Sequence, residues 1–338
     1  MNRKLLIAAA VAACAFTACS GRGTSATSAP ATPAVRQPAP AVHTFSDDSA
    51  FALVAAQVEM GPRPPGSQAS RRCAAWIESR LRAAGADTVI LQQGSVLRYD
   101  GTTLPACNIL GRFAPQASRR VLLAAHYDTR PWADMEPDAA RRMEPIDGAN
   151  DGASGVAVLL EIARCLGLQQ APVGVDILLV DAEDSGYGEL TAPPGTRDNG
   201  DSWCLGTQMW TASAPYAGTA SPAYAILLDM VGGQGARFHR EQFSDAFAPR
   251  IVDRIWAEAA ALGYADTFVN EPGGAVIDDH VYLRRAGIPA VDIIESLNPA
   301  TGSFPPTWHT SQDNIHNIDP ATLGRVGRTV LSLLYNEK

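Results

Sequence analysis

The chain has 338 residues, of which 46% are hydrophobic and 18% are charged. It can therefore bury a large core. The formal net charge of −8 argues against a nucleic-acid partner, because proteins that bind phosphate backbones present a basic face. Beyond the N-terminus, no apolar run is long enough to span a membrane.

The first 42 residues have the composition of an export signal followed by a tether. Two basic residues precede the apolar run 5–16, and Thr17-Ala18-Cys19 follows it. This ending is typical of a bacterial lipoprotein signal over residues 1–19, with Cys19 as the lipidated first mature residue. Cys14 also fits but would leave an unusually short signal, and cleavage by an ordinary signal peptidase is the alternative to lipidation. Residues 20–42 are rich in Ser, Thr, Ala and Pro and predict a flexible tether.

These segments predict an exported, periplasmic protein that is anchored by lipid to the cell envelope, with its folded domain at residues 43–338. We expect a monomer whose membrane contact is limited to that lipid. An even number of further cysteines permits disulfides in an oxidising compartment, although the spacing leaves free thiols equally open. None lies in a Cys-x-x-Cys pair, so they do not predict a thiolate zinc site. These cysteines are Cys73, Cys107, Cys165 and Cys204.

Helical and strand patterns alternate along the rest of the chain. Apolar residues at helical spacing predict helices at 46–58 and 68–84, and β-type runs follow at 88–91 and 106–113. Further apolar runs predict buried strands at 121–125, 175–180, 224–228 and 288–294. Helical patterns at 156–165, 203–212 and 247–262 separate these strands. A last helix is predicted from Asp319-Pro320 to Tyr335. The pattern predicts an α/β fold in a single domain, with a central, mostly parallel sheet of about six strands covered by helices.

Ionisable residues follow each of the four buried strands. In chain order they are His126 and Asp128, Glu183 and Asp184, Asp229, and, after a loop, His309. Ligands of α/β sheets bind outside the carboxyl ends of the strands, so we expect these side chains to meet. So many charges at one edge would repel one another, and a divalent cation would neutralise them.

Residues 146–155, Ile-Asp-Gly-Ala-Asn-Asp-Gly-Ala-Ser-Gly, supply a further acid just before a helix. The small neighbours of Asp151 would let its carboxylate reach a cation, whereas Asp147 is better explained as turn chemistry. Oxygen and imidazole ligands with one open position are typical of catalytic zinc. Neighbouring side chains leave an extended chain in different directions, so Glu183 and Asp184 can divide the work between base and ligand. The alternative for Glu183 and Asp184 is that both are ordinary surface acids exposed to solvent.

The order His-x-Asp, Asn-Asp-Gly-Ala-Ser-Gly, Glu-Asp, Leu-Asp-Met and His-Thr resembles the zinc aminopeptidase superfamily, which implies a mixed sheet wrapped by helices. Within it, the chain from about Phe45 onward is more similar to the glutaminyl cyclases of animal type and their bacterial relatives. The distinguishing residues are Ile277-Asp278-Asp279-His280, Phe304, and Trp308 immediately before His309. Two departures from animal members are Asp184 in place of Glu, and Ala125 where some members have a disulfide cysteine.

The resemblance implies a role for each matching residue. The zinc ligands would be Asp151, Asp184 and His309; the base Glu183; the accessory acids Asp229 and Asp278; the pocket wall Trp308, Phe304 and Ile277; and the supporting residues or second-metal ligands His126 and Asp128. Trp308 as an ordinary core residue is the alternative for that position.

The implied reaction is glutaminyl-peptide cyclotransfer, in which the N-terminal glutamine of a peptide or protein becomes pyroglutamate and ammonia is released. One zinc per chain would act as Lewis acid and Glu183 as general acid and base. The main alternative is a two-zinc aminopeptidase, in which His126 and Asp229 hold a second zinc and Asp151 bridges the two. A lipid-tethered binding protein with a vestigial site is disfavoured, because no position of the constellation is lost.

Overall fold

The computed structural model describes residues 44–216 and 221–337. The expected signal and tether lie outside the described residues, and the expectations about them stay predictions. Among the helices of the described part, none combines the length and the apolar character needed to cross a membrane.

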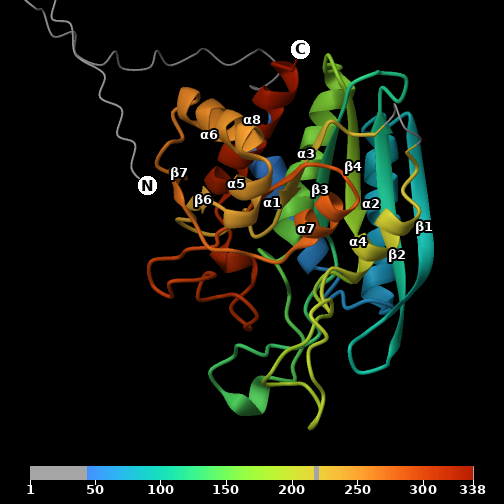
Figure 1. Ribbon diagram of the computed structural model, residues 1–338, viewed down its shortest axis with the longest axis vertical. Helices are drawn as coiled ribbons and strands as arrows, with labels where there is room; N and C mark the ends of the chain where they lie inside the picture. The colour runs from blue at the N-terminus through green and yellow to red at the C-terminus, as the bar shows by residue number, and fades with distance from the viewer. Residues whose placement is uncertain (1–43, 217–220, 338) are drawn as a thin grey trace, which may run out of the picture. The chain divides into compact units, whose positions relative to one another are not determined.

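The described chain is built on a six-stranded sheet in the order β1-β2-β4-β3-β5-β8 (Figure 1). Neighbouring strands among β4, β3, β5 and β8 are parallel, whereas β2 is antiparallel to both β4 and β1. The strands are β1 (Thr88–Leu97), β2 (Thr103–Phe113), β3 (Arg120–His126), β4 (Gly174–Val180), β5 (Tyr224–Leu228) and β8 (Ala290–Ile293). The predicted mixed, mostly parallel sheet is confirmed.

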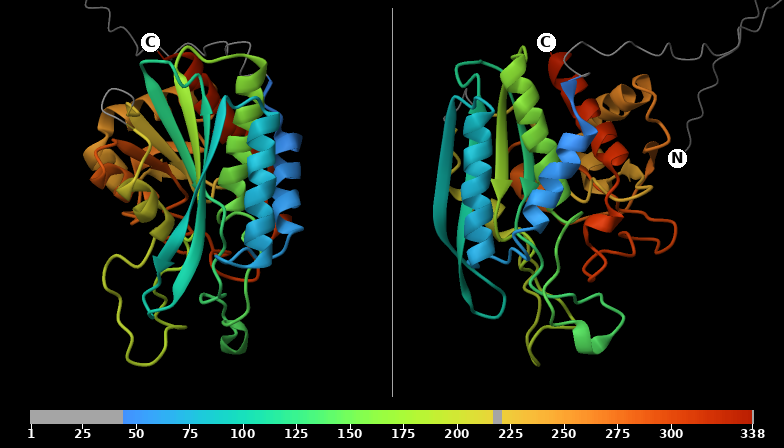
Figure 2. Two further views of the ribbon diagram at one scale, coloured as in Figure 1. Left: turned by 90° about the vertical axis from the view of Figure 1, so that its right-hand side faces the viewer. Right: turned by 180° about the vertical axis from the view of Figure 1, so that it is seen from behind.

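Helices cover both faces of the sheet (Figure 2). One face is covered by α1 (Asp47–Val58), α2 (Gln68–Ala83), α3 (Ala153–Leu168) and α8 (Pro320–Tyr335), and the other by α4 (Leu205–Ala212) and α7 (Asp279–Arg285). Every residue of β3 and β4 is buried as a result, as their mainly apolar sequences predict, and the buried Asp176 of β4 pairs with Arg120 of β3. Beyond β8 lie α5 (Gln242–Phe247), α6 (Pro249–Ala261) and the pair β6 (Phe238–Arg240) and β7 (Phe268–Pro272); α5 contacts β8, and α6 packs on α8 and β7.

Two glycines of the stretch 146–155 bring α3 close to the strand ends. A Cβ on Gly155 would lie 2.2 Å from the carbonyl oxygen of Leu228, at the end of β5. A Cβ on Gly152 would lie 2.4 Å from the carbonyl oxygen of His126. Only glycine permits these approaches, so this spacing sets the start of α3 against β3 and β5.

The carboxyl ends of β3, β4 and β5 meet at the same edge of the sheet. Long loops extend from that edge (Figure 1), and the loop after β3 contains the short 3-10 helix η2 (Ala139–Arg141). A second one, η4 (Ile315–Asn317), follows the loop after β8. Cys73, Cys107, Cys165 and Cys204 are all free thiols.

Candidate metal centre

Asp151, Asp184 and His309 meet at this edge, although they come from three separate loops. One ligand atom from each lies within 4.8 Å of the other two, and all three residues are buried. His309 Nε2 lies 3.1 Å from Asp184 Oδ1 and 3.6 Å from Asp151 Oδ2. Two carboxylates and an imidazole facing one point are the donor set of a catalytic zinc site.

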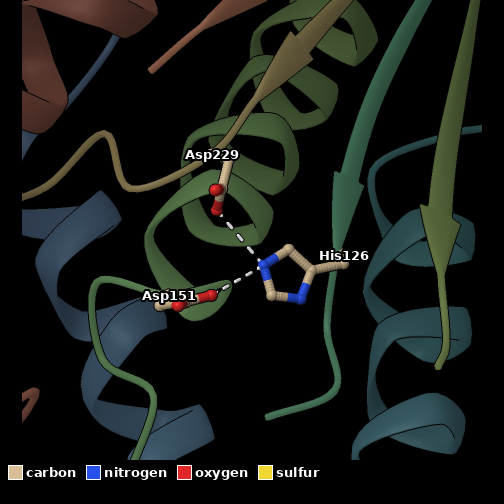
Figure 3. A group of neighbouring side chains, drawn as sticks. All are labelled: His126, Asp151 and Asp229. Carbon is tan, nitrogen blue, oxygen red and sulfur yellow. Dashed lines mark hydrogen bonds and ion pairs between the residues drawn. The ribbon is translucent and has the colours of Figure 1, made fainter. Parts of the chain in front are cut away.

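Asp151 also belongs to a second group, which includes His126 at the end of β3. Figure 3 shows the imidazole of His126 pointing between Asp151 and Asp229. His126 Nε2 lies 3.0 Å from Asp151 Oδ1 and 3.2 Å from Asp229 Oδ1. The two carboxylate oxygens of Asp151 therefore face two different histidines.

The residue facing the other side of His309 is Asp134, which the sequence pattern did not single out. Asp134 Oδ1 lies 3.0 Å from His309 Nδ1. A proton on Nδ1 is thus held by a carboxylate, which leaves the lone pair of Nε2 directed at Asp151 and Asp184. Metal-binding histidines are commonly oriented in this way.

Arg130 joins this histidine to the loop that carries Asp184. Its guanidinium is fully buried, makes two hydrogen bonds to the carboxylate of Asp134, and donates to the backbone oxygens of Asp184 and Gly186 at 3.0 and 2.8 Å. It also lies over the rings of two tryptophans, 5.0 Å from the centroid of Trp132 and 4.7 Å from that of Trp203. Arg130 was likewise missed, because nothing in its local sequence distinguishes it from a surface arginine.

Two buried aspartates orient the backbone of the site. Asp128 accepts hydrogen bonds from the backbone N–H groups of Glu183 and Asp184 at 3.1 and 3.2 Å, and its Oδ1 lies 3.4 Å from His126 Nδ1. Asp313 accepts from the N–H groups of Asn150 and Asp151 at 2.7 and 3.1 Å. Asp128 thus lies behind the candidate ligands, and Asp313 is a further residue that sequence reasoning did not find.

Glu183 lies beside the candidate ligands and forms a group with Cys204 and Asp278. One ligand atom from each of these three buried residues lies within 4.8 Å of the other two. Burial, with the charges of nearby Asp278 and Asp184, raises the pKa of Glu183 well above its usual value. A carboxyl group of raised pKa can both accept and return a proton near neutral pH.

Aromatic side chains form the wall next to His309. The ring of Trp308 is stacked on that of His309 at a centroid distance of 3.8 Å, and Phe304 lies 4.6 Å from Trp308. Both pack against the small apolar cluster of Met230, Val276 and Ile294. Ile277, by contrast, is 55% exposed, so it stands at the rim of the wall rather than within it. Asp147 belongs to none of these groups: its backbone oxygen accepts from Arg63.

The residues present fit a divalent zinc ion. Neither carboxylate oxygen of Asp184 accepts a hydrogen bond from the described protein, although both are fully buried. Burial, followed by repulsion from Asp151, raises the pKa of Asp184 to about 6 and that of Asp229 to about 7. A buried carboxylate with a raised pKa is electrostatically unsatisfied, and a cation held by Asp184, Asp151 and His309 Nε2 would neutralise the charge of Asp184.

Comparison with known proteins agrees with the fold and with this donor set. The sequence model of peptidase family M28 matches residues 108–334. The chain therefore belongs to this family of zinc-type enzymes. A solved glutaminyl cyclase from Bacteroides thetaiotaomicron is similar, with 44% identity, a TM-score of 0.83, and coverage of 87% of this chain and 99% of that one. The chain is thus a member of the glutaminyl cyclases within that family.

Two further relatives show the range of this similarity. A structure from the same organism, described as a leucine aminopeptidase precursor, has 44% identity and a TM-score of 0.82 and covers 87% of this chain and 98% of that one. Among curated proteins, the glutaminyl-peptide cyclotransferase-like protein of Bos taurus is 26% identical over 294 residues, which cover 80% of this chain and 71% of the relative.

Proposed function

We propose that the protein converts the N-terminal glutamine of peptides or proteins to pyroglutamate and releases ammonia. The observation that carries this proposal is the pair Glu183 and Asp278, whose carboxylates lie within 4.8 Å of each other beside the candidate metal ligands. Two buried carboxyl groups this close repel each other when both are ionised, so the pair holds a proton more readily than either group would alone. Cyclisation needs such a proton to be moved from one nitrogen to another.

In this proposal, Asp151, Asp184 and His309 hold one zinc, which when bound supplies Lewis-acid polarisation of the γ-carboxamide oxygen. The α-amine nitrogen of the substrate attacks the γ-carboxamide carbon, and a C–N bond forms. Glu183 takes one proton from that amine and returns it to the departing amide nitrogen, so that ammonia leaves as the second C–N bond breaks. Such proton transfer contributes about 10²–10⁴-fold to a rate. Asp278 and Asp229 share this proton with Glu183 as accessory acids. Trp308 provides a flat apolar wall for the short glutamine side chain.

The enzyme mainly has to orient the substrate, because the attacking amine and the carboxamide belong to the same residue. The wall formed by Trp308 and Phe304 and the rim at Ile277 would restrict where that residue can lie. Beyond the N-terminal residue we assign no sequence preference.

The second candidate is a two-zinc aminopeptidase, and one observation favours it. His126, Asp151 and Asp229 offer a second three-atom group, with Asp151 common to both groups. In that case two zinc ions would be bound and Glu183 would activate a water molecule.

One assay separates the two candidates. Purified protein is given a Gln-initiated peptide and a Leu-initiated peptide of the same length, and both ammonia and free amino acids are measured. We expect ammonia and pyroglutamyl peptide from the first and no free leucine from the second. Release of leucine without cyclisation would favour the aminopeptidase. Metal analysis of the same protein should give about one zinc per chain for the cyclase and two for the aminopeptidase.

We also propose that the protein is exported to the periplasm and anchored by a lipid on Cys19. The basic, apolar and small-residue order of residues 1–19 supports this. Metabolic labelling with a fatty acid should mark the wild-type chain and leave Cys19→Ser unlabelled. Labelling of Cys19→Ser but not of Cys14→Ser would move the modification to Cys14.

A further inference from the structure

The carboxylate of Glu183 has an unusual hydrogen-bond partner. Cys204 Sγ lies 3.3 Å from Glu183 Oε1, within the range of a thiol hydrogen bond. In the described part of the chain, no other hydrogen bond to this carboxylate is found. The partner is a thiol rather than a hydroxyl or amide, and it is fully buried.

The backbone holds Cys204 firmly in this place. Its N–H donates to the carbonyl oxygen of Glu183 at 2.9 Å, and the next N–H, that of Leu205, donates to Ala182 at 3.0 Å. A Cβ on Gly206 would lie 1.8 Å from the carbonyl oxygen of Asp181, so the first turn of α4 lies directly against the segment that carries the base.

This arrangement is maintained against a conformational cost. Cys204 has φ 57° and ψ 34°, the left-handed region, which costs a non-glycine residue on the order of 1 kcal/mol or more. A glycine would avoid that cost but would have no side chain to offer Glu183. Residues held in such conformations concentrate at functional sites.

The thiol also faces the second acid of the pair. Cys204 Sγ lies 4.0 Å from Asp278 Oδ1, so it stands between Glu183 and Asp278. Burial and the charge of Glu183 raise the pKa of this thiol well above its usual value, and it is therefore a proton-bearing donor. Because a thiol is a weak donor, it can orient a carboxylate without competing strongly for its lone pair.

We propose that Cys204 is a positioning residue for the general base: its S–H group donates to Glu183 Oε1, fixes the rotamer of this side chain, and leaves the other oxygen free to accept the substrate proton. The proposal deepens the proposed function and rests on Glu183 being the base. No bond to sulfur forms or breaks in this role.

The test compares Cys204→Ala, Cys204→Gly and Cys204→Ser with wild type in the full chain loaded with zinc. Cys73→Ala is the matched control, because Cys73 is also a fully buried free thiol but lies on α2, away from Glu183. We expect kcat to fall about tenfold in the Ala and Gly variants while KM and zinc content stay within twofold, and Ser to restore most of the loss. Cys73→Ala should lower the unfolding temperature without lowering kcat. The Gly variant suits the left-handed backbone and keeps the test open if Ala does not fold.

Two outcomes would overturn the positioning role. One is a kcat near wild type in both Cys204→Ala and Cys204→Gly. The other is a Ser variant as slow as Ala, which would point to packing alone. Failure of the proposed cyclase function would give a different result, because the wild-type protein itself would then release amino acids instead of ammonia. The kcat of each Cys204 variant relative to wild type could still be measured on that hydrolysis.

Discussion

At the scale of single residues, the site depends on how each imidazole is oriented. His309 presents Nε2 to Asp151 and Asp184 because Asp134 lies 3.0 Å from its Nδ1. Burial opposes a proton on His309, but Asp184 and Asp134 outweigh it and raise the pKa of His309 to about 9. Without metal, both ring nitrogens therefore carry protons at neutral pH, and a bound zinc would replace the proton on Nε2.

We expect Asp134→Asn to weaken zinc binding by about 10- to 100-fold, because an amide does not fix the proton on His309 Nδ1 as a carboxylate does. Competition with a chelator measures the affinity. Asp147→Asn is the matched control, since Asp147 lies in none of the ligand groups of the described chain; it should bind zinc as wild type does. Unchanged affinity in Asp134→Asn would show that the ring is held by other contacts.

The adjacent acids Glu183 and Asp184 should separate chemistry from metal binding. Glu183→Gln keeps the shape of the side chain but removes the proton acceptor, so we expect normal zinc content and a loss of turnover of about 10²–10⁴-fold. Asp184→Ala removes a candidate ligand and should lose the zinc itself. Elemental analysis and the ammonia assay on the same samples provide both readings. Near-normal turnover in Glu183→Gln would mean that another group is the base.

The pattern of elements predicted the site residues that follow a strand or precede a helix, whereas the roles of Phe304, Trp308 and His309, which lie in a loop, were predicted from the family resemblance. Strand ends are recognisable as the point where an apolar run stops, and parallel strands bring these points together. Arg130, Asp134 and Asp313 lie within loops, where no periodicity predicts which side chain turns inward. Their roles depend on how these loops fold over the strand ends.

At the scale of elements, Glu241 connects three segments near the site. Its carboxylate caps α5 by accepting from Phe243 and Ser244, and it also accepts the N–H of Val276, just before Asp278. His280 Nε2 lies 3.2 Å from Glu241 Oε2. Burial alone would raise the pKa of Glu241, but His280 and the N–H donors hold it at about 2.

This low pKa predicts a pH-dependent stability. The folded protein favours the ionised carboxylate more than the unfolded chain does, so the contribution is fully present above about pH 4.5 and is lost as the pH falls toward 2. Glu241→Gln should reduce the free energy of unfolding by about 3 kcal/mol at pH 7, and the gap to wild type should narrow below pH 4. Urea titrations at pH 7 and at about pH 3, between the folded and unfolded pKa values, measure it. Glu271→Gln, at an exposed position on β7, is the control, and a gap independent of pH would refute the interpretation.

The elements themselves were predicted well where periodicity was clear. The last helix begins after Asp319 and ends at Tyr335, and β5 covers 224–228, both as predicted. The segment 278–280, a distinguishing feature of the family resemblance for which the pattern predicts no helix, opens α7 with Asp278 as its N-cap. β1 runs on to Leu97 with most of its residues exposed, and an edge strand of this kind lacks the apolar alternation that identifies a strand in sequence.

At the scale of the whole molecule, the predicted tether has a direct test. If residues 1–42 serve only for export and attachment, a chain that begins at residue 43 should have the kcat/KM of the full protein within about twofold and should elute as a monomer in gel filtration. Kinetic comparison with detergent-solubilised full-length protein provides the measurement. A large loss of activity on truncation would assign the first 42 residues a part in the catalytic domain.

The buried carboxylates near the carboxyl edge of the sheet also limit how far the stability of this protein can be raised without loss of activity. Asp184, Asp229 and Asp279 are all buried with pKa values raised to between about 6 and about 8, so each lowers the stability of the ionised, metal-free fold. Amides at these positions would remove that cost, so selection for heat resistance alone would favour them. At Asp184 and Asp229 they would also remove a candidate zinc ligand and an accessory acid. Directed evolution of this enzyme should therefore screen for turnover in every round, since thermostability and activity oppose each other at the same few side chains.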